Sequence, residues 1–472
     1  MNTFLRHVFC AALLLLSLWQ PSVAIRSFQR LAQQAVTASA QSQSSAWQAA
    51  DPNASAYSEE KNQQRLALAT LYFSTGGDEW FNNDNWLSYE IDECLWYTTS
   101  STSPCDQNGV YISLNLTANG LSGSLPTEIA ELSALNTIDI NGNGVAGEVP
   151  ETVGTISNLT LLSLWENALS GTLPSSLGLL QQLQELILRS NQFSGSLPTE
   201  LSNASSLRVL SIDQNGFIGS IPPEYGALSN MQVFAARNNN LNGTLSEDLG
   251  TLSSLRELSI GQNSISGLLP TVFAQLTSLA VISCGNNNLS GSIPTEYDNL
   301  SNLTTFIAND NLLNGTLPSQ FETLVQLREL LLSKNSFTGN LPSNLGNLTM
   351  LRVLSVDQNG FVGSIPSEYG LLTQLSILDT SNNQLTGLLP TEFGQLSEIE
   401  ELILSKNEFS GELPTQLSNL TAMRALSVDQ NGFVGSIPTE YEALTRLVNF
   451  NANSNSLSVR FLLECMIFHV FF

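Results

Sequence analysis

The sequence predicts an α/β solenoid, in which one structural unit is repeated and stacked along about three quarters of the 472-residue chain. Three observations support this prediction. An asparagine recurs every 24 residues without a slip, leucines alternate with other residues before it, and a glycine and a proline follow at fixed distances. Repeats of about 20–50 residues are typical of solenoids. The recurring asparagines are Asn119, Asn143, Asn167, Asn191, Asn215, Asn239, Asn263, Asn287, Asn311, Asn335, Asn359, Asn383, Asn407, Asn431 and Asn455.

One unit shows how a coil is expected to fold. Leu186 and Leu188 alternate with polar or variable positions, which predicts a short strand with one buried face. Gly195 and Pro198 then mark a turn, and Leu201 begins a short helical or irregular return segment. A single coil cannot bury its own apolar face, whereas a stack of coils can.

The repeated asparagine is expected to be structural. It is a polar residue among the inward positions of the repeat, which are otherwise apolar. Its amide group both donates and accepts hydrogen bonds. Stacked asparagines can therefore satisfy the backbone groups of the turns inside each coil. We predict a ladder of structural asparagines and no catalytic role for it.

The pattern LxxLxLxxNxLSGxLPxxL, from Tyr111 to about Leu457, resembles the plant-type leucine-rich repeat. The resemblance implies a right-handed arc of about fifteen coils, with a parallel sheet lining the concave face. Similar repeats occur in the ectodomains of receptor-like kinases, in receptor-like proteins and in secreted enzyme inhibitors. The resemblance therefore implies binding of a ligand or a protein on the concave or lateral face.

Residues 58–110 resemble the N-terminal cap of this family, a helix followed by a segment rich in Trp and Cys. A repeat array needs such a cap to shield the end of its core. The family usually has a cysteine soon after the Gly-Val pair, where this chain has Tyr111. Cys94 and Cys105 are the natural pair for a disulfide, and Cys284 is expected to be a small core residue.

The N-terminal segment indicates secretion. Residues 1–24 have a basic start, a short apolar run and small residues at the end, which is typical of a signal peptide. Residues 25–57 are rich in Ala, Ser and Gln and are expected to be a disordered linker. Eleven Asn-x-Ser/Thr sequences agree with a secreted or cell-surface protein. Glycosylation is expected among others at Asn158, Asn203, Asn242, Asn302, Asn347 and Asn419.

The repeat pattern stops inside a unit near Leu457, and residues 458–472 form an apolar tail without the repeat. This tail contains Arg460, Glu464 and His469, and it is shorter than the ~20 apolar residues of a spanning helix. The expectation is a truncated or misread gene end, with further repeats in the true product. Membrane association would then require that missing C-terminal sequence or a co-receptor.

Acidic residues outnumber basic ones by 41 to 16, which gives a formal net charge of −25. Nucleic-acid binding requires a basic surface, so this class of function is excluded. Part of the acidity has a local cause, because glutamates recur two residues after the proline, where they favour the first turn of a helix. These glutamates are Glu128, Glu200, Glu224, Glu296, Glu368, Glu392 and Glu440.

The chain is not expected to be an enzyme or to hold a metal or cofactor. Its only histidines, His7 and His469, lie outside the capped repeats, so the usual nucleophile–base pairs and zinc sites have no histidine there. Asp213, Asp357 and Asp429 are expected on the concave face, but at least three coils apart. That spacing is roughly 14 Å, and a glycosidase pair requires about 5–9.5 Å.

Two series of aromatic residues occupy repeat positions that are held by core leucines in other coils. The tyrosines are expected to be buried for this reason, although an exposed stripe of this kind would suggest a binding site. They are Tyr225, Tyr297, Tyr369 and Tyr441, and the phenylalanines are Phe193, Phe217, Phe337, Phe361, Phe409 and Phe433.

The candidate partner site is the outward row that follows the inward pair of each strand. Trp165 is expected beside Arg189, within reach of a cation–π contact, and Arg189 beside Asp213. Glu166 and Arg237 complete the proposed site. Trp and Arg are enriched among residues that dominate interface energy. The alternative is a surface ladder whose members satisfy one another without a partner.

These observations favour an extracellular or cell-surface recognition module for a protein, peptide or glycan, receptor-like and without a kinase domain in this chain. One alternative is a structural glycoprotein of the cell surface or wall. Another is a secreted inhibitor of a hydrolase.

Overall fold

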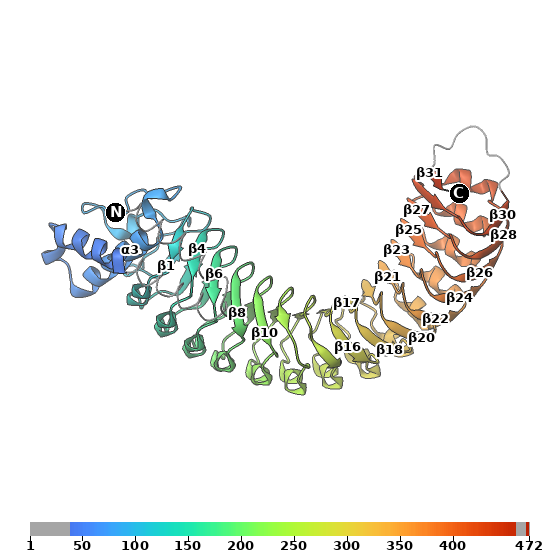
Figure 1. Ribbon diagram of the computed structural model, residues 1–472, viewed down its shortest axis with the longest axis horizontal. Helices are drawn as coiled ribbons and strands as arrows, with labels where there is room; N and C mark the ends of the chain where they lie inside the picture. Colours follow the sequence, from blue (N-terminus) through green and yellow to red (C-terminus); the bar gives the residue numbers. More distant parts are fainter. Residues whose placement is uncertain (1–37, 459–468, 472) are drawn as a thin grey trace, which may run out of the picture. The chain divides into compact units, whose positions relative to one another are not determined.

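The computed structural model describes residues 38–458 and 469–471 (Figure 1). The chain divides into two compact units, Met1–Phe217 and Ile218–Phe472. Residues 1–37, which include the expected signal peptide, lie outside the described part of the chain. Within that part, no helix is both long and apolar enough to cross a membrane.

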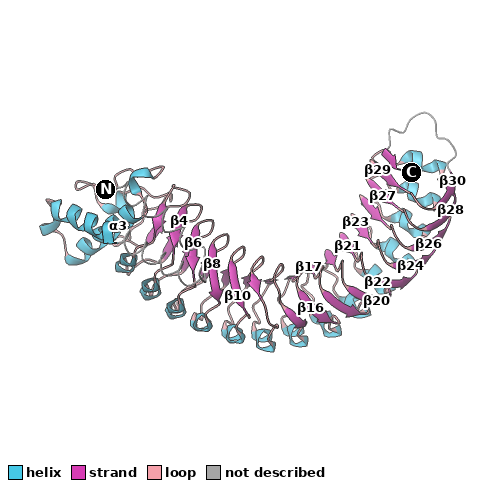
Figure 2. Ribbon diagram, in the orientation of Figure 1, coloured by secondary structure: helices cyan, strands magenta, loops and turns pink. Residues whose placement is uncertain are grey.

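Each coil follows one plan. A short strand is followed by a tight turn at the ladder asparagine, then by a second strand, a Gly–Pro turn and one turn of 3₁₀ helix. In one coil these are β7 (Glu185–Ile187), β8 (Gln192–Ser196) and η7 (Thr199–Asn203). Figure 2 shows the strands and the helical turns on different sides of each coil.

In the first unit, the odd-numbered strands pair in parallel in chain order, and the even-numbered strands form a second, lateral sheet. The other odd-numbered strands are β1 (Ser113–Asn115), β3 (Thr137–Asp139), β5 (Leu161–Ser163) and β9 (Val209–Ser211). The even-numbered strands are β2 (Ser122–Ser124), β4 (Gly144–Gly147), β6 (Ala168–Gly171) and, across the unit boundary, β10 (Gly216–Gly219). The remaining turns are η4 (Thr127–Glu131), η5 (Glu151–Thr155) and η6 (Ser175–Leu179).

The second unit repeats this plan. Its odd-numbered strands are β11 (Val233–Ala235), β13 (Glu257–Ser259), β15 (Val281–Ser283), β17 (Thr305–Ile307), β19 (Glu329–Leu331), β21 (Val353–Ser355), β23 (Ile377–Asp379), β25 (Glu401–Ile403), β27 (Ala425–Ser427) and β29 (Asn449–Asn451). Its lateral strands are β12 (Asn240–Leu241), β14 (Ser266–Leu268), β16 (Asn288–Gly291), β18 (Leu312–Gly315), β20 (Ser336–Asn340), β22 (Gly360–Gly363), β24 (Gln384–Gly387), β26 (Glu408–Gly411), β28 (Gly432–Ser436) and β30 (Ser456–Ser458).

The 3₁₀ turns of the second unit occupy the same phase in each coil. They are η8 (Pro223–Ala227), η9 (Glu247–Thr251), η10 (Thr271–Gln275), η11 (Thr295–Asn299), η12 (Ser319–Thr323), η13 (Ser343–Asn347), η14 (Ser367–Leu371), η15 (Thr391–Gln395), η16 (Thr415–Asn419) and η17 (Thr439–Ala443). As expected, the phased glutamates stand in the first turn, for example Glu200 in η7 and Glu368 in η14. A negative charge is favourable there.

Each odd-numbered strand pairs with the equivalent strand of the next coil, so equivalent core residues of successive coils lie side by side. Leu162 pairs with Leu186, and Leu186 pairs with Leu210, and all three side chains are buried. The phased tyrosines and phenylalanines are also buried, as expected from their shared phase with core leucines. Cys284 is buried and reduced, and burial raises the pKa of its thiol to about 12. The core is therefore a continuous stack of apolar layers within each unit.

The ladder asparagines hold the turns together. The Nδ2 of Asn191 donates to the carbonyls of Leu164 and Leu188 at 2.9 and 3.1 Å. Its Oδ1 accepts from the backbone N–H of Leu169 at 3.0 Å. The same pattern recurs at Asn335, which donates to Ala308 and Leu332 and accepts from Leu313. Each such amide therefore satisfies backbone groups of its own coil and of the preceding one.

The cap begins earlier in the chain than the sequence suggested. Residues 38–50 form a helix, and Ala54–Ala56 form the 3₁₀ turn η1, so the expected disordered linker over 25–57 is wrong for the described residues 38–57. The Nε1 of Trp47 donates to the carbonyl of Leu87 at 2.9 Å. The expected cap helix is α3 (Glu59–Ser74), in which Ser58 caps the N-terminus by accepting from the N–H of Lys61.

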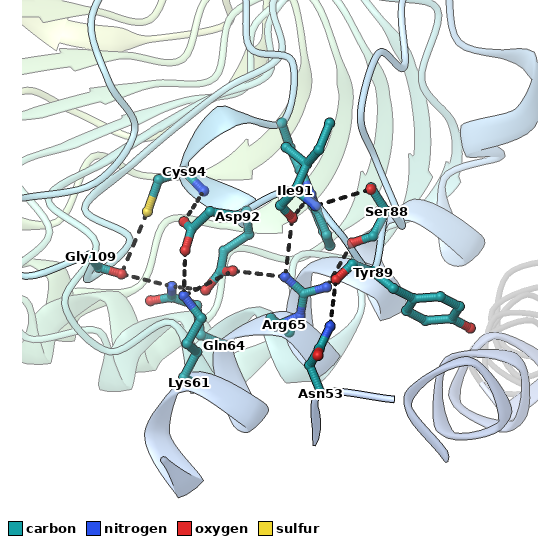
Figure 3. A network of polar contacts seen from close by, with 12 residues as sticks. Asn53, Lys61, Gln64, Arg65, Ser88, Tyr89, Ile91, Asp92, Cys94 and Gly109 are labelled. Atoms are coloured by element: carbon teal, nitrogen blue, oxygen red, sulfur yellow. Dashed lines mark hydrogen bonds and ion pairs between the residues drawn. The ribbon is translucent and has the colours of Figure 1, made fainter. Parts of the chain in front are cut away.

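A buried arginine joins the segments of the cap (Figure 3). Arg65 of α3 is only 1% exposed, and it pairs with Glu93 at 3.0 Å and with Asp51 at 3.5 Å. Its guanidinium also donates to the carbonyl of Ser88 at 2.8 Å and lies 5.2 Å from the ring of Trp96. The helix, the Trp-bearing segment and the linker are thereby held by one side chain.

Cys94 and Cys105 form a disulfide, as the pairing in the sequence indicated. Cys94 lies in the 3₁₀ turn η3 (Glu93–Leu95), and Cys105 forms an antiparallel bridge with Tyr111, where the first coil begins. Another short turn, η2 (Gly77–Glu79), follows α3. The cap also supports the ladder, because Asn119 exchanges hydrogen bonds with the backbone of Asn82.

The C-terminal tail differs partly from the expected non-repeat segment. Residues 459–468 and Phe472 lie outside the described part of the chain. The short strand β31 (His469–Phe471) pairs in parallel with β29, where Asn449 faces His469 and Phe450 faces Val470. The backbone of this segment therefore extends the sheet beside the last full coil.

Candidate binding surface

The odd-numbered strands expose a face made of alternate residues. In each coil, two side chains point into the core, and the residues between and beside them point outward. The candidate row follows the inward pair, and in the first unit it consists of Thr117, Asn141, Trp165, Arg189 and Asp213.

Trp165 and Arg189 are in contact. The guanidinium carbon of Arg189 lies 4.3 Å from the centre of the Trp165 ring, which is the stacking contact expected from the row. Arg189 is exposed and Trp165 is half-buried. The backbones are joined as well, because the N–H of Glu166 donates to the carbonyl of Arg189 at 3.0 Å. The contact is worth about 0.5–1 kcal/mol at an exposed site, and it leaves the guanidinium N–H groups on the surface.

Asp213 and Glu166 flank this pair in different ways. The carboxylate of Asp213 accepts from the hydroxyl of Ser211 at 3.0 Å, and the backbone carbonyl of Asp213 accepts from the N–H of Ser190. Glu166 is exposed and has a positive φ of 53°. The same left-handed conformation recurs immediately before each ladder asparagine, for example at Ser190 with 56°. The conformation of Glu166 therefore belongs to the repeat.

The fifth predicted residue, Arg237, belongs to the second unit, where its Nε donates to Oε1 of Gln262 at 3.2 Å. The structure thus places Trp165, Glu166, Arg189 and Asp213 on neighbouring strands of one unit.

Apolar side chains share this face with the predicted residues. Leu161, Ile187 and Val209 lie at outward positions of β5, β7 and β9 and are half-buried. The period-2 pattern of each strand places them outward, and this signal was available in the sequence. Together with Trp165 they place apolar side chains on a face that also carries polar ones, since Ser163 pairs with Ile187, and Glu185 pairs with Leu161 and Val209.

The second unit also carries apolar residues at these outward positions, such as Ile307 and Ile377, together with hydroxyl and carboxylate groups. The hydroxyl of Ser355 donates to Asp357 at 2.8 Å, and Ser405 donates to Asp429. Burial raises the pKa of Asp379, and the charges of Asp357 and Glu401 raise it further, although hydrogen bonds from Ser381 oppose the shift. A hollow of about 610 Å³ lies at the end of this face, lined by Glu401, Ile403, Ala425, Ser427, Asn449, Phe450, Asn451 and Asn453.

Among the described residues, no group of three His, Cys, Asp or Glu side chains is placed to hold a metal ion. Asp213, Asp357 and Asp429 keep the expected spacing of at least three coils, but Asp379 lies in the coil next to Asp357 and interacts electrostatically with Asp357 and Glu401. Carboxylates on this face are therefore closer together than the sequence suggested.

Comparison with protein families identifies the repeat. A model of the leucine-rich repeat region matches residues 111–217 and 307–451, and a model of the single leucine-rich repeat matches residues 254–276. The chain is a leucine-rich repeat protein. This is a non-catalytic binding fold. A search of curated proteins found no match.

Solved structures show which leucine-rich repeat proteins the chain resembles. The plant peptide hormone receptor RGFR1, in complex with RGF2, is 29% identical with a TM-score of 0.59, and the match covers 74% of this chain and 68% of the receptor. A TDR receptor is also 29% identical, with a TM-score of 0.69 over 74% of this chain and 65% of the receptor. The leucine-rich repeat protein LIC12759 of Leptospira interrogans is 31% identical, with a TM-score of 0.60 over 74% and 85%.

The chain thus spans about two thirds of the length of both plant receptors. The shared feature is the leucine-rich repeat fold of a receptor ectodomain.

Proposed function

We propose that this protein is an extracellular recognition module that binds a protein or peptide through the strand face of its first unit. The residues that carry the interaction are Trp165 and Arg189, flanked by Glu166 and Asp213. RGFR1, which is similar in fold, is described as a peptide hormone receptor in complex with RGF2. That similarity favours a polypeptide ligand over a polysaccharide.

The stacked pair is the observation that supports this proposal most strongly. Arg189 lies 4.3 Å above the Trp165 ring, so its position is fixed before a partner arrives. A side chain that is already ordered loses less conformational entropy on binding. Trp and Arg are also the side chains that most often dominate interface energy. Ile187, two residues before Arg189 on the same outward face, adds apolar area near the pair.

The positions of the expected glycans agree with this assignment. Asn158, Asn203, Asn302, Asn347 and Asn419 lie in or next to the 3₁₀ side of their coils, and all five are exposed. Asn242 follows the lateral strand β12 and is exposed as well. None of the six lies on an odd-numbered strand, so glycans at these sites would leave the strand face open. A further sequence of this type, Asn115-Leu-Thr117, begins on β1, two coils before Trp165, and a glycan there would stand at the N-terminal end of the face. The protein would then be secreted or held at the outer face of the plasma membrane.

Affinity capture tests the proposal and separates it from the alternatives. The secreted protein is immobilised and exposed to the extracellular fluid of the cells that produce it. A recognition module retains one polypeptide in stoichiometric amount, and the Trp165→Ala variant loses it. The Leu179→Ala variant is the matched control, because Leu179 is an exposed apolar residue on the 3₁₀ side of the same unit.

Two other outcomes would contradict the proposal. Retention of diffuse polysaccharide by both variants would indicate a structural wall glycoprotein. Retention of an active hydrolase with loss of its activity, unaffected by Trp165→Ala, would indicate an inhibitor that uses another surface.

A further inference from the structure

The lateral sheet of the second unit exposes two leucines in one row. Leu268 of β14 pairs with Ser290 of β16, and Ser290 pairs with Leu312 of β18. Leu268 is 65% exposed and Leu312 is 59% exposed. The two leucines are two strands apart, or roughly 10 Å. Exposed apolar side chains in one row add to the area that another molecule can contact.

The row is unusual within its own sheet. Leu388, which directly follows β24, is 66% exposed, and the nearest row on β26 and β28 pairs Ser410 with Gly432. Val362 lies between Asn340 and Gln384 on its neighbouring strands. Leu268 and Leu312 are thus two large exposed apolar side chains in one row, with Ser290 between them.

Leu268 also leans toward the row. A Cβ atom placed on Gly291 would lie 2.5 Å from Cδ2 of Leu268, so this leucine side chain covers the glycine of the next coil. Gly291 has a positive φ of 75°, a conformation that glycine adopts without strain. The leucine side chain therefore lies over the sheet surface, as Leu388 does over Gly411.

Two glycosylation sequences flank this row. Asn288-Leu-Ser290 lies on β16, and Asn314-Gly-Thr316 begins on β18. Asn288 is two residues before Ser290, and Asn314 is two residues after Leu312, so both asparagines share the outer face of the sheet with the row. Each lies about 7 Å along its strand from the row, and they lie on opposite sides of it. Both side chains are exposed.

The side-chain amides of Asn288 and Asn314 make no hydrogen bond to the described residues. By contrast, the amide of Asn302 donates to Thr277 at 2.8 Å, and that of Asn347 donates to Glu322 at 3.1 Å. A sugar attached at Asn288 or Asn314 would therefore displace no contact within the described structure.

We propose that Asn288 and Asn314 carry N-linked glycans that cover the leucine row formed by Leu268 and Leu312. This inference rests on the proposed extracellular location. A glycan is bulky and solubilising, and two of them, one on each side of the row, shield it from other protein molecules. The glycans keep the protein monomeric, and the lateral sheet is a covered surface that takes no part in ligand binding.

Glycopeptide mass spectrometry of the protein secreted from eukaryotic cells tests the modification. We expect glycans at both Asn288 and Asn314. Occupancy at Asn419, on the 3₁₀ side, shows that the chain has passed through the glycosylating compartment. If Asn419 is glycosylated while Asn288 and Asn314 are not, this inference is overturned and the proposed function is not affected. If all three are bare, the extracellular part of the proposed function is overturned with it.

Self-association tests the role of the glycans. The double variant Ser290→Ala with Thr316→Ala removes both sequences but keeps both asparagines. We expect its mass in sedimentation to shift from monomer toward dimer or larger species. Adding Leu268→Ser and Leu312→Ser should return it to monomer. Asn419→Gln, the matched loss of a glycan where no leucine row is present, should remain monomeric.

Enzymatic removal of the glycans from the folded wild-type protein gives a second test if the double variant is not secreted. The same shift in mass is expected. A deglycosylated protein that stays monomeric overturns the shielding role. Association that persists after both leucines are replaced assigns the contact to another surface and also overturns it.

Discussion

At the residue scale, the ladder shows how one polar side chain stabilises a stack of apolar coils. Asn335 donates at 3.0 and 3.1 Å to two backbone carbonyls and accepts at 3.0 Å from one N–H. These backbone groups lie inside the turn, away from water. Because an unsatisfied buried group costs free energy, the asparagine is required even though it occupies an apolar phase.

Replacing this side chain should therefore be costly. We expect Asn335→Ala to lower the free energy of unfolding by ~1–3 kcal/mol, because it leaves backbone donors and acceptors without partners. Denaturant melts measure the change. Gln395→Ala, at an exposed position in η15, is the control and should remain within about 0.5 kcal/mol of wild type. Equal effects of the two changes would show that the ladder bonds do not stabilise the coil.

Asp379 offers a prediction about pH. Burial raises the pKa of its carboxyl above the ordinary 3.8, with contributions from Asp357 and Glu401. The folded protein therefore binds a proton at this carboxyl more tightly than the unfolded chain does. The free energy of unfolding falls as pH rises from the ordinary pKa of 3.8 through the raised pKa of the folded state. Asp379→Asn should be more stable than wild type at neutral pH. The advantage should shrink as pH falls toward 3.8 and below. Thermal melts across this range that show a constant difference would contradict the assignment.

At the element scale, the cap depends on one buried cation. Arg65 faces Glu93 and Asp51, both buried, so its removal takes the nearest cation from two buried carboxylates. Glu93 keeps a hydrogen bond from Gln64 and an ion pair with Lys61. Breaking a buried pair in this way costs about 3–5 kcal/mol. We expect Arg65→Met to destabilise the cap by that order, measured by unfolding of the intact protein.

Lys61 provides the matched comparison. It pairs with the partly exposed Asp92 at 2.6 Å, and its ammonium also lies 3.5 Å from the buried Glu93. Its closer pair is partly exposed, where a pair contributes about 0–1 kcal/mol, and Arg65 still pairs with Glu93 when Lys61 is replaced. Lys61→Met should therefore cost less stability than Arg65→Met. If both variants lose the same stability, the buried network does not hold the cap as described.

The disulfide gives the cap its second constraint. Cys94 and Cys105 are separated by 11 residues. Closing a loop of this length restricts the unfolded chain and should stabilise the fold by roughly 3 kcal/mol. The double change Cys94→Ser with Cys105→Ser should lose about that much in denaturant melts. Unreduced mass mapping that finds free Cys94 in the folded secreted protein would contradict the bridge.

The elements that the sequence predicted and those that it missed differ in their apolar pattern. The coils were predictable because a leucine alternation, an asparagine and a Gly–Pro turn all recur with one period. The helix over residues 38–50 was missed because it buries small side chains, Ala40 and Ser44, four residues apart. Such a face has almost no hydropathy signal. Its anchor, Trp47, is a single residue and forms no period.

At the scale of the whole molecule, repetition made the fold predictable but not the site. Every coil has the same outward positions, so the period cannot distinguish the coil that binds a partner. The contact of Trp165 with Arg189 was predictable because strand register places them side by side. The apolar residues Leu161 and Ile187 were not predicted as part of the site, because they lie within the strands, whereas the predicted row follows the inward pair of each strand. Arg237 was assigned to the same site, but it belongs to the other unit.

The central claim is that the strand face around Trp165 binds a polypeptide partner. Its most direct test is the dissociation constant of the captured partner for wild type, Trp165→Ala and Leu179→Ala. We predict that Trp165→Ala weakens binding by about 2 kcal/mol or more, which is roughly 30-fold, with an unchanged melting curve. Leu179→Ala should bind like wild type. An affinity unchanged by Trp165→Ala would contradict the account and assign recognition to a different surface.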